Sequence, residues 1–129
     1  MNDETYLMPS HVRLLVSDVE RSIPFYEGLG FTCINRDGVF VHLRWAKYAD
    51  VFLVVLPNGA GLGGQRGLGV LLAFYGGDIP LDTIAARAVK LGAAVDGPKV
   101  MPWFSNELVV TDPDGYRLVF VMPTDPVLA

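Results

Sequence analysis

Histidine and cysteine, two side chains that often hold transition metals, are almost absent from this chain. Its 129 residues include two histidines, His11 and His42, and one cysteine, Cys33. A single cysteine excludes an intramolecular disulfide and fits a reducing compartment, so we expect a cytoplasmic protein. A nucleophilic cysteine needs a base nearby, and the apolar segment around Cys33 favours a buried, unreactive thiol instead.

Long apolar runs and clustered positive charge are lacking too. No segment approaches the roughly 18 consecutive apolar residues of a membrane-spanning helix. The first ten residues, MNDETYLMPS, have no basic region of the kind that opens a secretory signal. Ten Lys and Arg against 14 Asp and Glu give a formal net charge of −4, and the basic residues are scattered. We therefore expect neither nucleic acid nor a membrane as a partner.

Apolar residues, in contrast, make up 51% of the chain. That fraction is high for one small domain, and the excess must be buried in a core, a ligand pocket or a subunit interface. Exposed apolar faces and strand edges favour pairing between copies, so we expect a homodimer.

Hydrophobic periodicity predicts the same order of elements twice. The first half reads as strand, helix and three strands, at 11–16, 17–30, 31–36, 39–45 and 51–56. The second half repeats that order, at 69–75, 78–93, 94–100, 107–112 and 116–122. Ser17 or Asp18 begins the first helix and Gly30 ends it, while Pro24 predicts irregular first turns.

The repeat determines the expected fold class, which is α+β. We expect a single domain over residues 1–129, built from two βαβββ modules at about 10–57 and 70–123. The two sheets are predicted to form a curved, half-open mixed β-sheet cup with the helices outside. In the second helix, Ile84, Ala88 and Leu91 share one apolar face.

The modules are joined by a Gly-rich linker at 58–69. It contains the G-x-G-x-x-G spacing of a dinucleotide-binding loop, at Gly59, Gly61 and Gly64. Such a loop cradles a pyrophosphate only where it opens a helix. Here more glycines and a strand-like VLLAFY follow, so we predict a mobile linker that binds no nucleotide.

Three features resemble the vicinal oxygen chelate superfamily of glyoxalases, bleomycin resistance proteins and extradiol dioxygenases. HVRLLVSDVERSIPFYEGLGF resembles the family's opening strand and helix. MPWFSNELVVTDPDGYRLVF resembles its closing motif, with Tyr116 in place of the usual Asn. The repeated module covers about residues 10–123. The resemblance implies the double-module fold, which hosts both enzymes and pure binding proteins.

In metal-using members, the resemblance implies ligands from the first and last strands of each module. His11 stands at the first of these positions, but the others fall near Leu53, Leu71 and Val119, which have no donor atoms. A metal site needs roughly three or four converging ligands, and adding His42 gives only two imidazoles. We therefore expect no metal and no other cofactor, and interpret His11 as a ligand-binding or structural remnant of a metal site.

Strand alternation places His11 and Arg13 on a mixed face that looks into the predicted cup. The candidate ligand-binding residues are the polar and aromatic side chains expected in the cup or at its mouth: His11, Arg13, Phe40, His42, Trp45, Trp103, Phe104, Glu107 and Arg117. Stacking on a planar ligand is the role expected of Trp103. Other roles stay open: the tryptophans cap the core or a dimer interface, Arg13 pairs with a surface acid, and Glu107 is a solvated carboxylate.

The sequence therefore favours a metal-free small-molecule-binding protein of the glyoxalase/bleomycin resistance type. It would bind a hydrophobic or aromatic ligand in the cup and sequester a drug or toxin. One alternative is a lyase, isomerase or dioxygenase of the glyoxalase type, using a divalent metal or a metal-free acid/base pair. Another is a protein whose own side chains fill the cup. No pair of titratable residues identifies a reaction, so catalytic residues stay unassigned.

Overall fold

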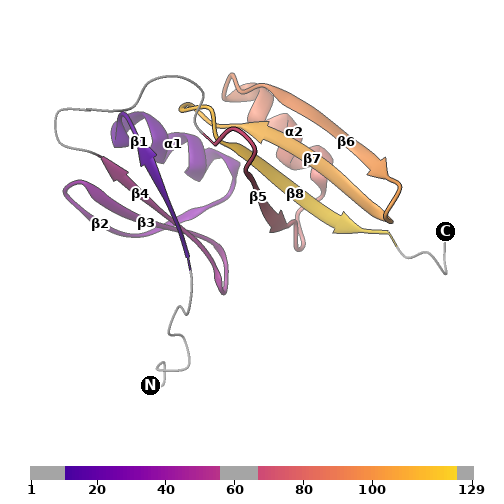
Figure 1. Cartoon of the computed structure of the whole chain (residues 1–129), viewed down its shortest axis with the longest axis horizontal. Helices are drawn as coiled ribbons and strands as arrows, with labels where there is room; N and C mark the ends of the chain where they lie inside the picture. Colours follow the sequence, from indigo (N-terminus) through magenta and orange to yellow (C-terminus); the bar gives the residue numbers. More distant parts are fainter. Residues whose placement is uncertain (1–10, 56–66, 125–129) are drawn as a thin grey trace. The chain divides into compact units, whose positions relative to one another are not determined.

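The computed structural model describes residues 11–55 and 67–124, which belong to two compact units (Figure 1). The units, Met1–Leu62 and Gly63–Ala129, are called module one and module two below. Residues 58–66 of the predicted linker lie outside the described residues.

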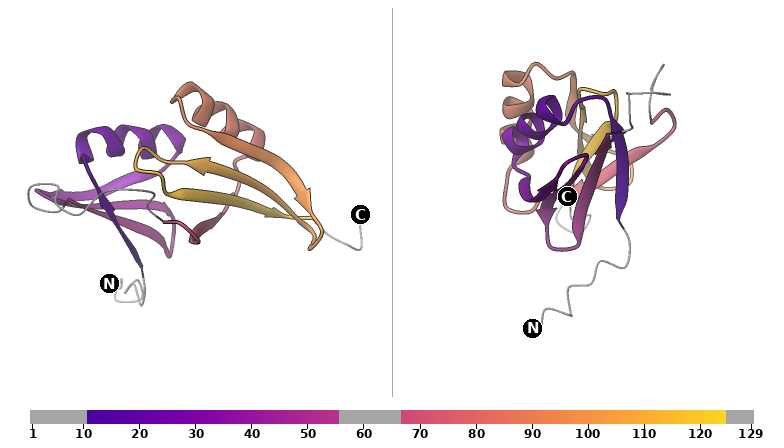
Figure 2. Two further views of the ribbon diagram at one scale, coloured as in Figure 1. Left: turned by 45° about the horizontal axis from the view of Figure 1, so that its top comes forward. Right: turned by 90° about the vertical axis from the view of Figure 1, so that its left-hand side faces the viewer.

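Module one has one helix on one face of a four-stranded mixed sheet (Figure 2). Its elements are β1 (Val12–Val16), α1 (Val19–Leu29), β2 (Thr32–Asp37), β3 (Phe40–Ala46) and β4 (Ala49–Val55). The strand order is β1-β4-β3-β2, with β1 parallel to β4 and the other pairs antiparallel. The parallel pair requires a long crossover, which α1, β2 and β3 supply.

Capping residues at both ends determine the length of α1. The Asp18 carboxylate accepts a hydrogen bond from the backbone N–H of Glu20 at 2.9 Å, and Gly30 ends the helix with a φ of 132°. The helix continues through Pro24, so the predicted irregularity is wrong. Pro24 is exposed while its neighbours on both sides are buried, and their packing offsets the one backbone hydrogen bond that a proline removes.

The core of module one lies between α1 and the sheet. Alternate residues of three strands point to the helix and are almost fully buried: Leu14, Val16, Val41, Leu43, Val51 and Leu53. The alternation predicted for β1 and β3 is therefore confirmed, and the residues between these positions lie on the opposite face of the sheet.

Module two repeats the arrangement with its own helix and sheet (Figure 2). Its elements are β5 (Leu71–Tyr75), α2 (Leu81–Lys90), β6 (Val95–Met101), β7 (Ser105–Thr111) and β8 (Arg117–Pro123). The strand order is β5-β8-β7-β6, with β5 parallel to β8. Ile84 and Ala88 are buried as predicted, but α2 ends at Lys90, and Leu91, beyond its last turn, is 38% exposed.

The predicted α+β class with two βαβββ modules is confirmed. The joining of the two sheets into one cup stays a prediction. No helix among residues 11–55 and 67–124 is long and apolar enough to cross a membrane.

The DPDG sequence makes the turn between β7 and β8, and the side chain of Asp112 holds it together. One carboxylate oxygen accepts the backbone N–H of Asp114 at 2.9 Å and that of Tyr116 at 2.8 Å. Asp112 is itself buried. Because Tyr116 takes part through its backbone, the replacement of the usual Asn leaves these hydrogen bonds unchanged.

We predict that Asp112→Ala lowers the free energy of unfolding by about 1–3 kcal/mol, because two backbone donors lose their acceptor. Urea denaturation of the two proteins measures the difference. Asp112→Asn is the matched control, since its amide oxygen keeps an acceptor in place and should restore much of the loss. Equal destabilisation by Ala and Asn would contradict this role of the acceptor.

Candidate ligand-binding site

The face of the module-one sheet opposite α1 brings together four of the nine predicted binding residues. We call it the aromatic face and define it by seven residues: His11, Arg13, Phe40, His42, Arg44, Asp50 and Phe52. The strand register aligns them in rows, because Arg13 and His42 flank Phe52, and Arg44 lies opposite Asp50.

Phe52 is the centre of this face and contacts three other rings. His42 stacks on it with ring centroids 4.4 Å apart and an interplanar angle of 16°. His11 lies at 4.5 Å and Phe40 at 4.9 Å, both tilted. Phe52 is 8% exposed, so its neighbours cover most of it. Sequence reasoning missed Phe52 because residues 51–55 of β4 are apolar on both faces and show no alternation.

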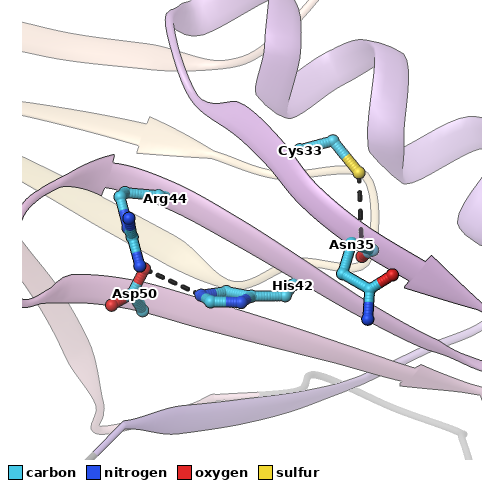
Figure 3. Close-up of polar contacts among 5 residues, drawn as sticks. All are labelled: Cys33, Asn35, His42, Arg44 and Asp50. Carbon is cyan, nitrogen blue, oxygen red and sulfur yellow. Dashed lines mark hydrogen bonds and ion pairs between the residues drawn. The ribbon is translucent and has the colours of Figure 1, made fainter. Parts of the chain in front are cut away.

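A buried carboxylate lies beside these rings. One oxygen of Asp50 lies 2.9 Å from His42 Nε2 and 2.9 Å from Arg44 Nε (Figure 3). Asp50 is 7% exposed, and a buried carboxylate needs such partners to offset its desolvation. Sequence reasoning placed Asp50 in a loop, but β4 begins at Ala49 and brings Asp50 into the sheet opposite Arg44.

Cys33 is separate from this cluster. It lies on the edge strand β2 opposite Leu43, whose side chain faces α1, so its thiol and His42 are on opposite faces of the sheet. Its sulfur contacts the carbonyl oxygen of Asn35 at 3.8 Å (Figure 3). Cys33 is only partly buried, so the expectation of a buried thiol is wrong: an edge strand offers less cover than a central one.

His11 and Arg13 form a pair at the other side of Phe52. Arg13 Nε donates a hydrogen bond to His11 Nε2 at 3.1 Å. The Arg13 guanidinium also lies over the Phe40 ring, 5.4 Å from its centroid. Arginine has no acceptor atom, so this geometry requires an unprotonated Nε2 and places the proton of a neutral His11 on Nδ1.

The donors at these positions do not fit the metal site that the family resemblance implies. The lone pair of His11 Nε2 accepts from a guanidinium, whose positive charge would repel a metal ion. The β4 side chain that faces His11 is Phe52, while Leu53, the position that the resemblance implies, is buried toward α1. No group of three or more His, Cys, Asp or Glu in the described part of the chain is placed to hold a metal.

Module two also lacks metal-binding donor atoms at the two positions that the family resemblance implies. Leu71 and Val119 lie on the face of their sheet away from α2, since their neighbours Leu118 and Phe120 are fully buried on the helix side. Both side chains are hydrocarbon, and neither can bind a cation.

The predicted binding residues of module two are only partly brought together. Trp103 lies in the turn between β6 and β7, is 61% exposed, and donates its indole N–H to Glu107 at 2.9 Å. Phe104, next to it, is also exposed. Arg117 lies opposite Thr111, at the far end of β7 from Glu107.

Trp45 lies apart from the other predicted residues of module one. It occupies an irregularity in the pairing of β3 with β4, between Arg44 and Ala46. Its ring contacts Phe31 at 5.1 Å, and Phe31 contacts the buried Tyr26 at 5.2 Å. The structure thus places Trp45 beside the core, on the helix side of the sheet.

The chain belongs to the Glyoxalase/Bleomycin resistance protein/Dioxygenase superfamily, whose family model matches residues 9–120. No curated protein matches the chain. Membership of this superfamily agrees with the double βαβββ order described above.

Solved structures of similar fold cover most of the chain. A hypothetical protein, SA1046 from S. aureus, is 20% identical with a TM-score of 0.71, covering 90% of this chain and 94% of its own. A bleomycin-binding protein complexed with bleomycin is 19% identical with a TM-score of 0.66, covering 88% and 96%. A glyoxalase/bleomycin resistance protein from Streptomyces sp. CB03234 is 29% identical with a TM-score of 0.61, covering 87% and 97%.

We predict that the purified protein contains no stoichiometric divalent metal, because no donor set converges around His11 among the residues that the structure describes. Elemental analysis after growth in metal-supplemented medium measures the content, with His11→Ala as the control. Wild type and variant should be equally metal-poor. One Ni, Zn, Fe or Mn per chain that disappears in the variant would contradict the prediction.

Proposed function

We propose that this protein is a metal-free small-molecule-binding protein that holds a planar, hydrophobic or aromatic ligand on the aromatic face of module one. The observation that supports this most is the ring cluster around Phe52, with polar side chains along its margin. Apolar and aromatic side chains with a few placed polar groups are the usual lining of a ligand site. Sequestration of a toxic compound is the biological role that we propose, in the cytoplasm.

The similar structures support the same proposal. One of them is a bleomycin-binding protein complexed with bleomycin, so the fold is compatible with holding a small molecule without a named reaction. At 19% identity the likeness extends to the fold alone, and bleomycin is not proposed as the ligand of this chain. The proposal depends instead on the side chains of the aromatic face.

A metal-free lyase or isomerase is the second candidate, and the contact between His42 and Asp50 at 2.9 Å favours it. A carboxylate that orients an imidazole is a common arrangement for moving a proton. Arg44 lies at the same oxygen of Asp50 and already compensates its charge. The carboxylate is thus explained by its structural partners, and we favour binding over catalysis.

We predict that Phe52→Leu weakens the binding of a planar uncharged probe, naphthalene-2-carboxamide, by about two- to tenfold. Phe52 is itself covered by the rings that pack on it, so leucine acts through them. It keeps the apolar bulk but removes the ring contacts, worth about 0.5–1.5 kcal/mol beyond area burial, that align His11, Phe40 and His42 for the ligand. Titration followed by amide NMR shifts measures the dissociation constant and also shows which module responds.

Two further variants make this experiment specific. Phe25→Leu is the matched control: Phe25 is as buried as Phe52 but lies on α1, which covers the opposite face of the sheet, so the change should leave the dissociation constant unchanged. Trp103→Ala tests the exposed indole of module two as the stacking surface. A loss of roughly tenfold in Trp103→Ala, with no change in Phe52→Leu, would place the ligand on module two and contradict the proposed site.

We also propose that the protein pairs into a homodimer. The edge strand β5 carries Leu71 and Tyr75, which are 58% and 60% exposed, and an apolar edge strand favours association. Multi-angle light scattering at micromolar concentrations should give twice the 14.1 kDa chain mass. Leu71→Lys should shift the equilibrium toward monomer, and a wild type that is monomeric throughout would contradict the proposal.

A further inference from the structure

We infer that Arg13 is an anion-binding residue, and that the ligand of the aromatic face is an aromatic compound carrying a carboxylate next to its ring. This inference rests on the proposed function and specifies the chemistry of its ligand. It also assigns His11 the task of positioning Arg13.

The first observation is that the charge of Arg13 is not compensated by the part of the chain that the structure describes. No carboxylate within residues 11–55 or 67–124 forms an ion pair with it; its contacts are His11 and the Phe40 ring. The only acid of the aromatic face, Asp50, is held by His42 and Arg44. The face is therefore positive, although the chain has a net charge of −4.

A positive patch on an acidic protein selects for anionic ligands. The rest of the chain carries a net negative charge and repels an anion, whereas the aromatic face attracts one. The charge distribution consequently favours a negatively charged ligand over a neutral or cationic one on the same rings.

The second observation is that two contacts limit the conformations of the exposed Arg13 side chain before any ligand arrives. Its Nε donates to His11 at 3.1 Å, and its planar group lies 5.4 Å from the Phe40 centroid. These contacts leave both terminal NH2 groups of the guanidinium as donors. Such a fork matches the two oxygens of a carboxylate, and restricting it beforehand lowers the entropy that binding costs.

The third observation links the charge to the rings. Phe40, which Arg13 overlies, is 4.9 Å from Phe52, and Phe52 is 4.4 Å from His42. A ligand that lies along these rings and reaches Arg13 needs its carboxylate directly on the aromatic system. A long flexible chain between ring and acid would extend past the guanidinium, so arylcarboxylates fit better than aryl-substituted fatty acids.

The test compares two probes of the same shape, naphthalene-2-carboxylate and naphthalene-2-carboxamide, by NMR titration of the full chain. Wild type should bind the carboxylate on the order of tenfold more tightly than the amide, because only the carboxylate makes charge-assisted hydrogen bonds. Arg13→Gln should abolish that difference by weakening the carboxylate alone. Raising the salt concentration should have the same effect in a graded manner.

Arg21→Gln is the matched control for overall charge. Arg21 is exposed on α1, bonds Ser17 at 2.9 Å and lies away from the aromatic face. Its loss changes the net charge by the same amount as the loss of Arg13, and it should leave the preference for the carboxylate within about twofold of wild type.

His11 is tested as a positioning residue by rescue. His11→Ala removes the acceptor for Arg13 Nε and should weaken naphthalene-2-carboxylate by a few-fold. His11→Gln offers an amide oxygen to the same N–H and should recover part of the loss. In both variants naphthalene-2-carboxamide should change less than the carboxylate.

The outcomes separate this inference from the proposed function. If wild type binds the amide as tightly as the carboxylate, or if Arg21→Gln lowers the preference as much as Arg13→Gln, the inference is wrong and the proposed function stands. If neither probe binds, both are wrong. If the carboxylate is preferred only while Arg13 is present, both are supported.

Discussion

The packing of α1 against one face of the module-one sheet is the constraint on which the candidate site depends. Leu14, Leu43 and Leu53 are buried under the helix, and side chains on a strand alternate between its two faces. Burying one set therefore commits the intervening residues to the other face. A shift of one residue in register would exchange the two sets and expose the core, so the hydrophobic packing of the helix side also fixes the position of Phe52.

The buried carboxylate of Asp50 is the second constraint, and it acts on the polar side of the same face. Removing a carboxylate from water is costly unless charged or hydrogen-bonding partners replace the lost solvation. Arg44 and His42 provide them from the neighbouring strand. The same contact fixes the plane of the His42 ring, which then stacks on Phe52 at 16°. The contacts that compensate the charge of Asp50 and the stacking of His42 on Phe52 thus depend on one another.

The sequence predicts the fold better than the site, for physical reasons that particular residues show. Alternation in β1 and β3 correctly separates Arg13 and His42 from the core. Residues 51–55 of β4 are apolar on both faces, so only their pairing partners show that Phe52, and not Leu53, faces His11. Likewise, Trp45 lies at an irregularity of strand pairing that no local pattern reveals, and its ring joins the core.

The position of His11 explains how the proposed site would bind its ligand without a metal ion. An imidazole nitrogen has one lone pair, and here it accepts a hydrogen bond from the guanidinium of Arg13. A metal ion and this guanidinium cannot share that lone pair, and their charges repel each other. At the position where the family resemblance implies a metal ligand, His11 thus contacts a side-chain cation that is covalently part of the protein. In the proposed site that cation would supply the charge that binds an oxygen anion, and its directional, planar donors would select a carboxylate by shape as well as by charge.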